Sequence, residues 1–373
     1  MTLSRYLGII AIFCALFLTA CSDASPIIVG FSGQLTGSNS DLGTAGRNGV
    51  ILALENINAA GGIDGRPLEL LTADDHNTPE GAIQADRELI DAGVVAIIGH
   101  MTSSLCLAAM PQISENGIVM ISPTASSPQF SGKVDAFFRT MMEASVRSKD
   151  LAEYAYSRIG INSVVSVAES DNKSYSFSFI ANFGDAFKAL GGRMVGEITY
   201  STQNPQDWQK LIAELKEKRP DALLLACPAQ DAAAIVQKIN FSGLHLPILS
   251  GSWAYTERLL LWGGRYAEGM IFAIDYAFDN PRPEFIKFKE HYKNRFGKEP
   301  NFASAFSYEA TLALAEGLKK TKGTPTGLAN AMAPSQTING VVGPFKLNPF
   351  GDVTRKVFIV TVQNKEFRTL EMR

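Results

Sequence analysis

Two short segments concentrate hydroxyl groups at places where a binding site could form. They are residues 102–104 (Thr-Ser-Ser) and residues 124–127 (Thr-Ala-Ser-Ser), each placed after a short apolar stretch of strand length. Since open α/β sheets bind ligands at the carboxyl ends of their strands, these hydroxyls and nearby backbone N–H groups could hold a carboxylate. A predicted helix beginning near Ser103 would add a favourable dipole. The alternative is that these side chains only cap helices, which we prefer for Ser104.

Residues able to catalyse a reaction do not come together in a known pattern. The sequence contains neither a Gly-x-Ser-x-Gly elbow nor a phosphate-binding P-loop. Residues 170–173 (Ser-Asp-Asn-Lys) combine two motifs of penicillin-binding enzymes, but those motifs belong on separate elements. The histidines lack metal-ligand spacing; they are His76, His100, His245 and His291. Of these, His100 could lie on the floor of a cleft. We therefore expect no enzyme, no metal and no cofactor.

Length and charge favour a two-domain protein that does not bind nucleic acid. The chain has 373 residues, of which 46% are hydrophobic, and a formal net charge of -3. This length allows two domains, each large enough for its own core. No basic run appears in the sequence, so it offers none of the clustered positive charge that a nucleic-acid-binding face needs.

The N-terminus predicts export and a lipid anchor. Residues 7–18 form an apolar run within the range of a signal peptide and too short to span a bilayer. Residues 18–21 (Leu-Thr-Ala-Cys) then resemble a bacterial lipobox. We expect a signal peptide over residues 1–20 and acylation of Cys21, which would anchor the chain outside the cytoplasm, in the periplasm or at the cell surface. The alternative is an ordinary signal peptide followed by a chance cysteine.

Apolar runs of strand length alternate with helical patterns in two successive parts of the chain. The first part contains predicted strands at residues 27–31, 68–72, 94–98 and 118–121. The second contains predicted strands at residues 164–168, 194–200, 222–226 and 247–249. Helical patterns fill the intervals, and this alternation is typical of parallel sheets covered by helices on both faces. The sequence therefore predicts an α/β protein with two doubly wound parallel-sheet lobes.

The remaining chain predicts a hinge of several segments. After residue 276 come two strong helices, a short helix, a Gly-rich hairpin and a last strand at residues 357–362, so the chain should cross between the lobes more than once. We assign residues 26–143 and 276–352 to the first lobe, and residues 144–275 and 353–373 to the second. Cys14 leaves with the signal peptide and Cys21 is acylated, so Cys106 and Cys227 remain. They lie in different lobes, and we expect two free, mostly buried thiols.

One stretch near the N-terminus carries a resemblance to a known family. Residues 56–67 (Asn-Ile-Asn-Ala-Ala-Gly-Gly-Ile-Asp-Gly-Arg-Pro) resemble the signature of the leucine-binding-protein family, the type I periplasmic binding proteins of branched-chain amino acid ABC transporters. Its glycines let a helix stop and reverse through positive φ. Further matches follow in order over nearly all of the mature chain, at residues 74–75, 97–99, 121–126 and 339–345. The resemblance implies the periplasmic binding protein-like I fold.

The resemblance also implies roles for particular residues. Ser103, Thr124 and Ser126 match the positions that hold the ligand's carboxylate in the first lobe. In the second lobe, Tyr175 matches an aromatic that touches the ligand, with a surface aromatic at a helix start as the alternative. Leu42 occupies a position that is often aromatic in the family and would line the apolar end of the pocket.

Departures from the family pattern leave the ligand open. Where amino acid binders place an acid for the ligand's ammonium, Trp253 stands nearest. An ammonium without an anion is costly in a dry cleft, so either another acid serves or the ligand has no ammonium. Trp253 could then stack on a flat ligand such as an aromatic acid, or simply pack between the lobes. The candidate acids are Asp171, Glu143 and Asp275. Further candidates for the apolar wall are Phe302, Phe306 and Tyr308, with core packing preferred for Phe306.

These features predict an extracytoplasmic solute-binding lipoprotein of an ABC uptake transporter that holds a branched-chain amino acid or a related small carboxylate between two lobes. Aromatic acids or amides are the alternative ligands, and a ligand-binding sensor or regulator is the alternative role. The expected partners are the solute, an ABC permease in the inner membrane, and the membrane through the N-terminal lipid. We expect a monomer.

Overall fold

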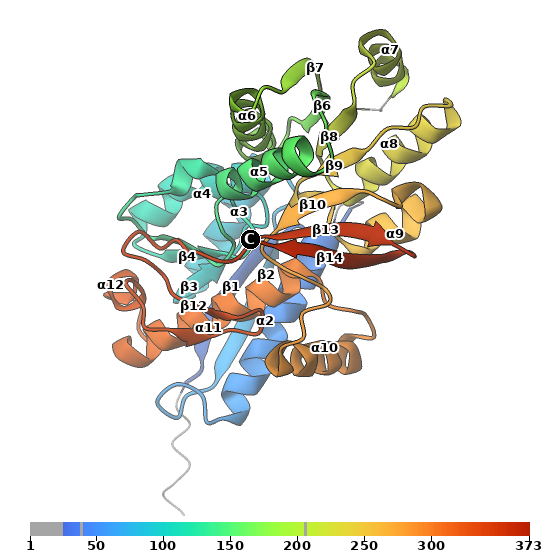
Figure 1. Cartoon of the computed structure of the whole chain (residues 1–373). Coiled ribbons are helices and arrows are strands. Elements are labelled where there is room, and N and C mark those ends of the chain that lie inside the picture. The colour runs from blue at the N-terminus through green and yellow to red at the C-terminus, as the bar shows by residue number, and fades with distance from the viewer. Residues whose placement is uncertain (1–24, 38–39, 205–206) are drawn as a thin grey trace, which may run out of the picture.

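The first lobe is built on a five-stranded parallel sheet. The structure is a computed structural model that describes residues 25–37, 40–204 and 207–373; the predicted signal peptide and Cys21 lie outside these ranges. The strand order is β2-β1-β3-β4-β5, and every neighbouring pair is parallel (Figure 1). The strands are β1 (Ile27–Gly33), β2 (Leu68–Asp74), β3 (Ala96–Ile98), β4 (Val119–Ser122) and β5 (Phe137–Arg139).

The second lobe contains a seven-stranded mixed sheet in the order β14-β13-β10-β9-β8-β6-β7. Pairs from β6 to β10 are parallel, whereas β13 pairs antiparallel with both β10 and β14. We did not predict β5, β10 or β14: the first two are short buried runs, and β14 is a polar edge strand with little apolar signal. The strands are β6 (Ser163–Glu169), β7 (Arg193–Tyr200), β8 (Ala222–Ala226), β9 (Ile248–Ser250), β10 (Ile271–Ile274), β13 (Phe358–Gln363) and β14 (Glu366–Met372).

Helices pack around both sheets (Figure 1). The first lobe carries α2 (Asp41–Ala59), α3 (Pro79–Asp91), α4 (Ser103–Glu115), α10 (Pro283–Phe296), α11 (Phe302–Thr321) and α12 (Leu328–Met332), together with the hairpin of β11 (Ile338–Asn339) and β12 (Pro344–Phe345). The second lobe carries α5 (Ala144–Glu153), α6 (Lys173–Ala189), α7 (Gln209–Lys218), α8 (Ala229–Phe241) and α9 (Glu257–Gly263). No helix in the described part of the chain is long and apolar enough to cross a membrane. Cys106 and Cys227 are free and buried, as predicted.

Three segments carry the chain between the lobes. They connect β5 to α5, β10 to α10, and β12 to β13. Buried charges tie these segments to one another. Asp275 in the second segment receives a hydrogen bond from Met142 N at 2.7 Å and pairs with Arg147 Nη1 at 2.8 Å. Arg355 in the third donates from Nε to the Thr140 carbonyl at 2.9 Å and pairs with the buried Glu309.

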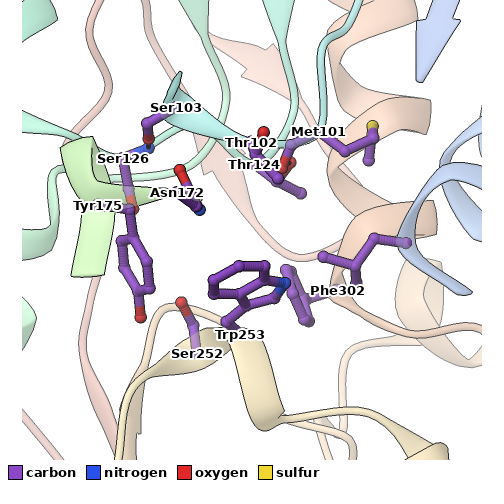
Figure 2. Close-up of a pocket in the computed structure, with 11 residues that line it drawn as sticks. Met101, Thr102, Ser103, Thr124, Ser126, Asn172, Tyr175, Ser252, Trp253 and Phe302 are labelled. Carbon is purple, nitrogen blue, oxygen red and sulfur yellow. Dashed lines mark hydrogen bonds between the residues drawn. The ribbon is translucent and has the colours of Figure 1, made fainter. Parts of the chain in front are cut away.

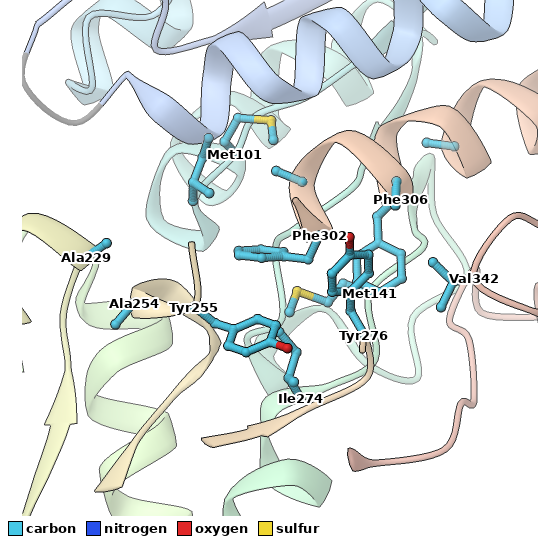
Figure 3. Close-up of a cluster of buried hydrophobic side chains, with 14 of the residues drawn as sticks. Met101, Met141, Ala229, Ala254, Tyr255, Ile274, Tyr276, Phe302, Phe306 and Val342 are labelled. Carbon is cyan, nitrogen blue, oxygen red and sulfur yellow. The ribbon is translucent and has the colours of Figure 1, made fainter. Parts of the chain in front are cut away.

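Apolar side chains make the core continuous across this hinge. Figure 3 shows Phe302 and Phe306 of the first lobe beside Tyr255 of the second and Tyr276 of the connecting segment. The Tyr276 ring lies 6.3 Å from Phe306 and 6.4 Å from Tyr255, measured between ring centroids. The hinge is therefore a packed structure and not a loose tether. The exact lobe boundaries stay a prediction from the sequence.

Helices α2 and α11 pack side by side because glycine allows their backbones to approach closely. A Cβ placed on Gly49 of α2 would lie 2.1 Å from the backbone oxygen of Ser304 in α11. The start of α11 is fixed by a capping box, in which Ser304 N donates to Asn301 Oδ1 at 3.2 Å and Asn301 N donates to Ser304 Oγ at 3.0 Å. The backbone of Ser304 therefore cannot easily move away.

We expect Gly49→Ala to lower the free energy of unfolding by about 1–3 kcal/mol, because the added methyl forces α2 and α11 apart. Urea denaturation followed by circular dichroism measures this change. The matched control is Gly184→Ala in α6, where the new Cβ would meet only the flexible Met194 side chain at 3.3 Å; its stability should stay unchanged or rise slightly. Equal unfolding midpoints for Gly49→Ala and the unmodified chain would contradict the close α2–α11 contact.

Candidate functional site between the lobes

A small cavity lies where the two lobes meet, at the carboxyl ends of the strands (Figure 2). The first lobe contributes an apolar group consisting of Leu42, Met101 and Phe302. It also contributes a hydroxyl group of residues, Thr102, Ser103, Thr124 and Ser126. The second lobe contributes Asn172, Tyr175, Ser252 and Trp253. The structure thus brings together six of the seven binding residues proposed from the sequence.

The two hydroxyl loops of the first lobe are bonded to each other. Ser103 Oγ accepts hydrogen bonds from the backbone N–H groups of Ser126 and Ser127, at 3.1 and 3.2 Å. Thr124 Oγ1 donates to the Met101 carbonyl at 2.6 Å. The Ser103 hydroxyl proton therefore remains available to a ligand, whereas that of Thr124 is already used.

Backbone donors complete this wall of the cavity. Thr102, Ser103 and Thr124 have no partner for their N–H groups among the described residues. Those of Thr102 and Ser103 lie at the N-terminal end of α4, where the helix dipole favours a negative charge. The wall offers donors without a cation, which is suited to a small anionic group.

A buried histidine supports both loops from below. His100 Nδ1 lies 2.8 Å from Asp75 Oδ2, and Nε2 lies 3.2 Å from Asp86 Oδ1. The His100 carbonyl accepts from Ser122 Oγ at 2.7 Å, and Ser122 Oγ in turn accepts from Ala125 N at 3.0 Å. Burial alone would lower the pKa of His100, but the charges of Asp86 and Asp75 outweigh it and raise the pKa to about 10. The imidazolium is thus part of the scaffold beneath the binding loops.

The second lobe presents its residues from two strand ends. Asn172 and Tyr175 stand at the start of α6, and Trp253 lies in a short helical turn after β9. Glu169 holds the first of these loops, accepting from Asp171 N at 2.7 Å and Asn172 N at 2.9 Å. Burial raises the pKa of Glu169 to about 8. The rings of Tyr175 and Trp253 meet edge to face, with centroids 6.1 Å apart.

Direct contacts between the lobes flank the cavity on two sides. On one side, Ser104 N donates to Asn172 Oδ1 at 3.1 Å, and Ser174 N donates to Ser104 Oγ at 3.2 Å. On the other, Thr256 Oγ1 donates to Asp41 Oδ2 at 3.1 Å. We call these contacts the α4–α6 latch and the Asp41 latch. Ser104, which we expected only to cap a helix, bridges the lobes. The structure is therefore a closed form of the clamp.

Two predicted wall residues lie away from the cavity. The Tyr308 hydroxyl accepts a hydrogen bond from Asn56 Nδ2 at 2.9 Å, and its ring packs against Phe288 at 5.3 Å between centroids. Tyr308 faces α2 and α10 because it sits on a different side of α11 from Phe302, which does line the cavity. Phe306 is fully buried in the core, as we preferred.

The candidate acids for an ammonium are all engaged elsewhere. Asp171 accepts from Thr202 N at 2.9 Å and Thr202 Oγ1 at 2.6 Å. Glu143 binds Ser131 and Ser145, and Asp275 belongs to the hinge. None of these carboxylates lines the cavity, and no other acid does so within the ranges that the structure describes.

Sequence reasoning missed several lining residues. In the sequence, Asn172 belongs to a Ser-Asp-Asn-Lys stretch that resembles only an unrelated enzyme motif, and Ser252 carries no signal of its own beside Trp253. Thr102 belonged to a loop that we singled out, so its hydroxyl was a usable signal. Met101 carried no signal, since a methionine after a buried strand is indistinguishable from core.

Comparisons with known proteins agree with this geometry. The family model described as "Periplasmic binding protein" matches residues 26–366. The Leu/Ile/Val-binding protein homolog 3 of Brucella melitensis is 23% identical over 359 residues, covering 93% of this chain and 94% of the relative. The predicted family resemblance is thereby confirmed.

Two solved structures share the fold at a TM-score of 0.85. One is the branched-chain amino acid transporter substrate-binding protein LivJ of Streptococcus pneumoniae in complex with isoleucine, 22% identical over 93% of this chain and 99% of that one. The other is an ABC transporter solute-binding protein of R. palustris in complex with benzoate, 20% identical over 93% of this chain and 96% of that one. The predicted two-lobed α/β fold is confirmed.

The His100 ion cluster makes stability depend on pH. A histidine whose pKa rises from 6.5 to about 10 on folding stabilises the protein fully below pH 6.5, and this contribution is lost as the pH rises toward 10. We expect a loss on the order of 3 kcal/mol between pH 6.5 and 9, measured by urea denaturation. Asp86→Asn should flatten this slope, while replacing the exposed His291 by Gln should not. A slope unaffected by Asp86→Asn would contradict the assignment.

Proposed function

Because the chain belongs to the periplasmic binding protein family, we propose that it is the extracytoplasmic solute-binding lipoprotein of an ABC uptake transporter and holds a small carboxylate between its lobes. The observation that carries this proposal is the row of unpaired donors on the first-lobe wall of an interlobe cavity. These are the Ser103 hydroxyl and the N–H groups of Thr102, Ser103 and Thr124, which have no partner within the described residues.

A carboxylate fits these donors better than a neutral group does. It accepts several hydrogen bonds at once, and each bond to a charged acceptor contributes about 1.5–3 kcal/mol. No lysine or arginine lines the cavity in the part of the chain that the structure describes, so the charge would be held by dipoles alone. Relatives named for leucine, isoleucine and valine support a branched-chain amino acid or a related small carboxylate as the solute.

The proposed function also requires the lobes to close around the solute, and the two latches are contacts that hold them closed. A ligand shifts a two-state equilibrium only as far as its affinities for the two states differ. Asn172, Tyr175 and Trp253 come from the second lobe, so a solute bound to the first lobe gains their contacts only when the clamp closes. The closed form would then dock on the permease and release the solute.

Membrane attachment and the transporter partner complete the proposal. Residues 18–21 carry the lipobox-like sequence that would place a lipid on Cys21, and this anchor would keep the clamp beside an ABC permease of the inner membrane. Relatives in the ABC class, such as the R. palustris protein bound to benzoate, support the same role.

The carboxylate assignment predicts a paired response in thermal unfolding. We expect at least one of L-leucine and benzoate to raise the melting temperature by a few degrees, while L-leucinamide and benzamide have no effect. Replacing both Ser103 and Ser126 by alanine should abolish the shift. The matched control is Ser114→Ala, an exposed serine on the same helix as Ser103. Stabilisation by the amides alone would overturn the assignment.

The α4–α6 latch predicts an effect on affinity that does not depend on the solute. Ser104→Ala removes the acceptor for Ser174 N, so the fraction of molecules in the closed form falls. The apparent affinity for the solute then falls in proportion. A hydrogen bond of about 1 kcal/mol corresponds to a loss of about fivefold. Calorimetric titration with benzoate and with L-leucine should give the same factor for every solute that binds, because Ser104 does not line the cavity. Different factors would mean that Ser104 touches the solute.

A further inference from the structure

From the charges and rings around the cavity, we infer that the solute is an aromatic monocarboxylate that carries no ammonium group. This inference rests on the proposed function, because it takes the first-lobe donors as the carboxylate site. The groups that would face the rest of the solute lie on the opposite wall and at the apolar end of the cavity.

None of the described residues that line the cavity can neutralise an ammonium. Its lining residues include no aspartate or glutamate within the described ranges. Asp75 lines an adjoining space, but it belongs to the His100 ion cluster. Asp171 and Glu80 line an outer groove at the cavity mouth, and Asp171 is already bonded to Thr202. A buried ammonium without an anionic partner is strongly disfavoured.

A buried cation stands behind the second-lobe wall. Arg147 is 1% exposed and pairs through Nη1 with Asp275, while its Nη2 has no hydrogen-bond partner among the described residues. Burial raises the pKa of Tyr175, and the positive charge of Arg147 acts against that shift. Asp275 is occupied by this ion pair, so it offers no free carboxylate to an ammonium beside Tyr175.

Aromatic rings line the part of the cavity where the body of the solute would lie. Figure 2 shows the Trp253 indole between the Tyr175 ring and Phe302, with Thr102 and Thr124 above it. Leu42 and Met101 fill the remaining end. Aromatic pairs gain stability beyond that from the area they bury. A flat ring inserted beside Trp253 would gain this, and a branched aliphatic chain would not.

The hydroxyl of Tyr175 is a buried polar group of the second-lobe wall and lies beside Gly251 and Ser252. Tyr175 is 4% exposed, and its hydroxyl, although close to Ser252 and the Trp253 backbone, makes no hydrogen bond of good geometry with any described residue. Buried polar groups are normally satisfied.

Matched pairs of solutes test the two parts of this inference by calorimetric titration of the purified full chain. L-Phenylalanine and 3-phenylpropanoate differ only in the ammonium, and we expect 3-phenylpropanoate to bind at least about 100-fold more tightly. Benzoate and cyclohexanecarboxylate have the same charge and similar size, and we expect benzoate to bind about tenfold more tightly because only benzoate has a flat π system.

A pair of variants tests whether the Trp253 indole contacts the aromatic ring of the solute. Trp253→Leu should weaken benzoate binding about tenfold and leave cyclohexanecarboxylate binding nearly unchanged. The matched control is Trp262→Leu, because Trp262 lies on α9, is 44% exposed and does not line the cavity; it should leave both affinities unchanged. Equal losses for the two solutes in Trp253→Leu would overturn the aromatic part.

The outcomes separate this inference from the proposed function. If L-leucine or L-phenylalanine binds as tightly as its counterpart without the ammonium, namely 4-methylpentanoate or 3-phenylpropanoate, this inference fails while carboxylate binding stands. If no carboxylate binds but benzamide does, the carboxylate site itself is wrong, and both fail together.

Discussion

The closed clamp depends on buried charges that join the three connecting segments. Asp275 takes a hydrogen bond from Met142 and an ion pair from Arg147, while Arg355 bonds the Thr140 carbonyl and Glu309. Removing such charges from water is expensive, and well-packed apolar residues would stabilise a fold at least as well. Their geometry, however, fixes how the segments lie against one another. The position of each lobe relative to the cavity follows from that arrangement.

A buried ion cluster also fixes the hydroxyl wall of the first lobe. His100 sits between Asp75 and Asp86, and its carbonyl anchors Ser122, which holds the second hydroxyl loop. Ser103 then joins the two loops directly. The donors are therefore held in place before a ligand arrives, so little ordering is needed on binding. In the proposed function, the first lobe would hold the solute and the second lobe would close over it.

The fold does not determine the solute, so the charges and polar groups that line the cavity must do so. Related folds enclose isoleucine in one solved structure and benzoate in another, so shape alone does not select the ligand. Here the described lining contains donors, aromatic rings and no carboxylate. In the proposed function, the hydroxyl wall would hold the acid group of either kind of solute, and the opposite wall would determine which other groups the solute can carry.

The sequence alone determined the alternation of strands and helices, the two lobes, the hydroxyl loops around Ser103 and Ser126, and the missing acid near Trp253. These features are local: apolar periodicity, glycine turns and short loops after strands are all read within a few residues. Only the tertiary structure decided that Ser104 bonds Asn172, that Asp171, Glu143 and Asp275 are engaged elsewhere, and that Tyr308 turns toward Asn56. The reason is that each of these outcomes depends on which distant segments pack together. The side of α11 that faces the cavity, or the partner that a carboxylate finds, is fixed by packing and not by the neighbouring residues in the chain.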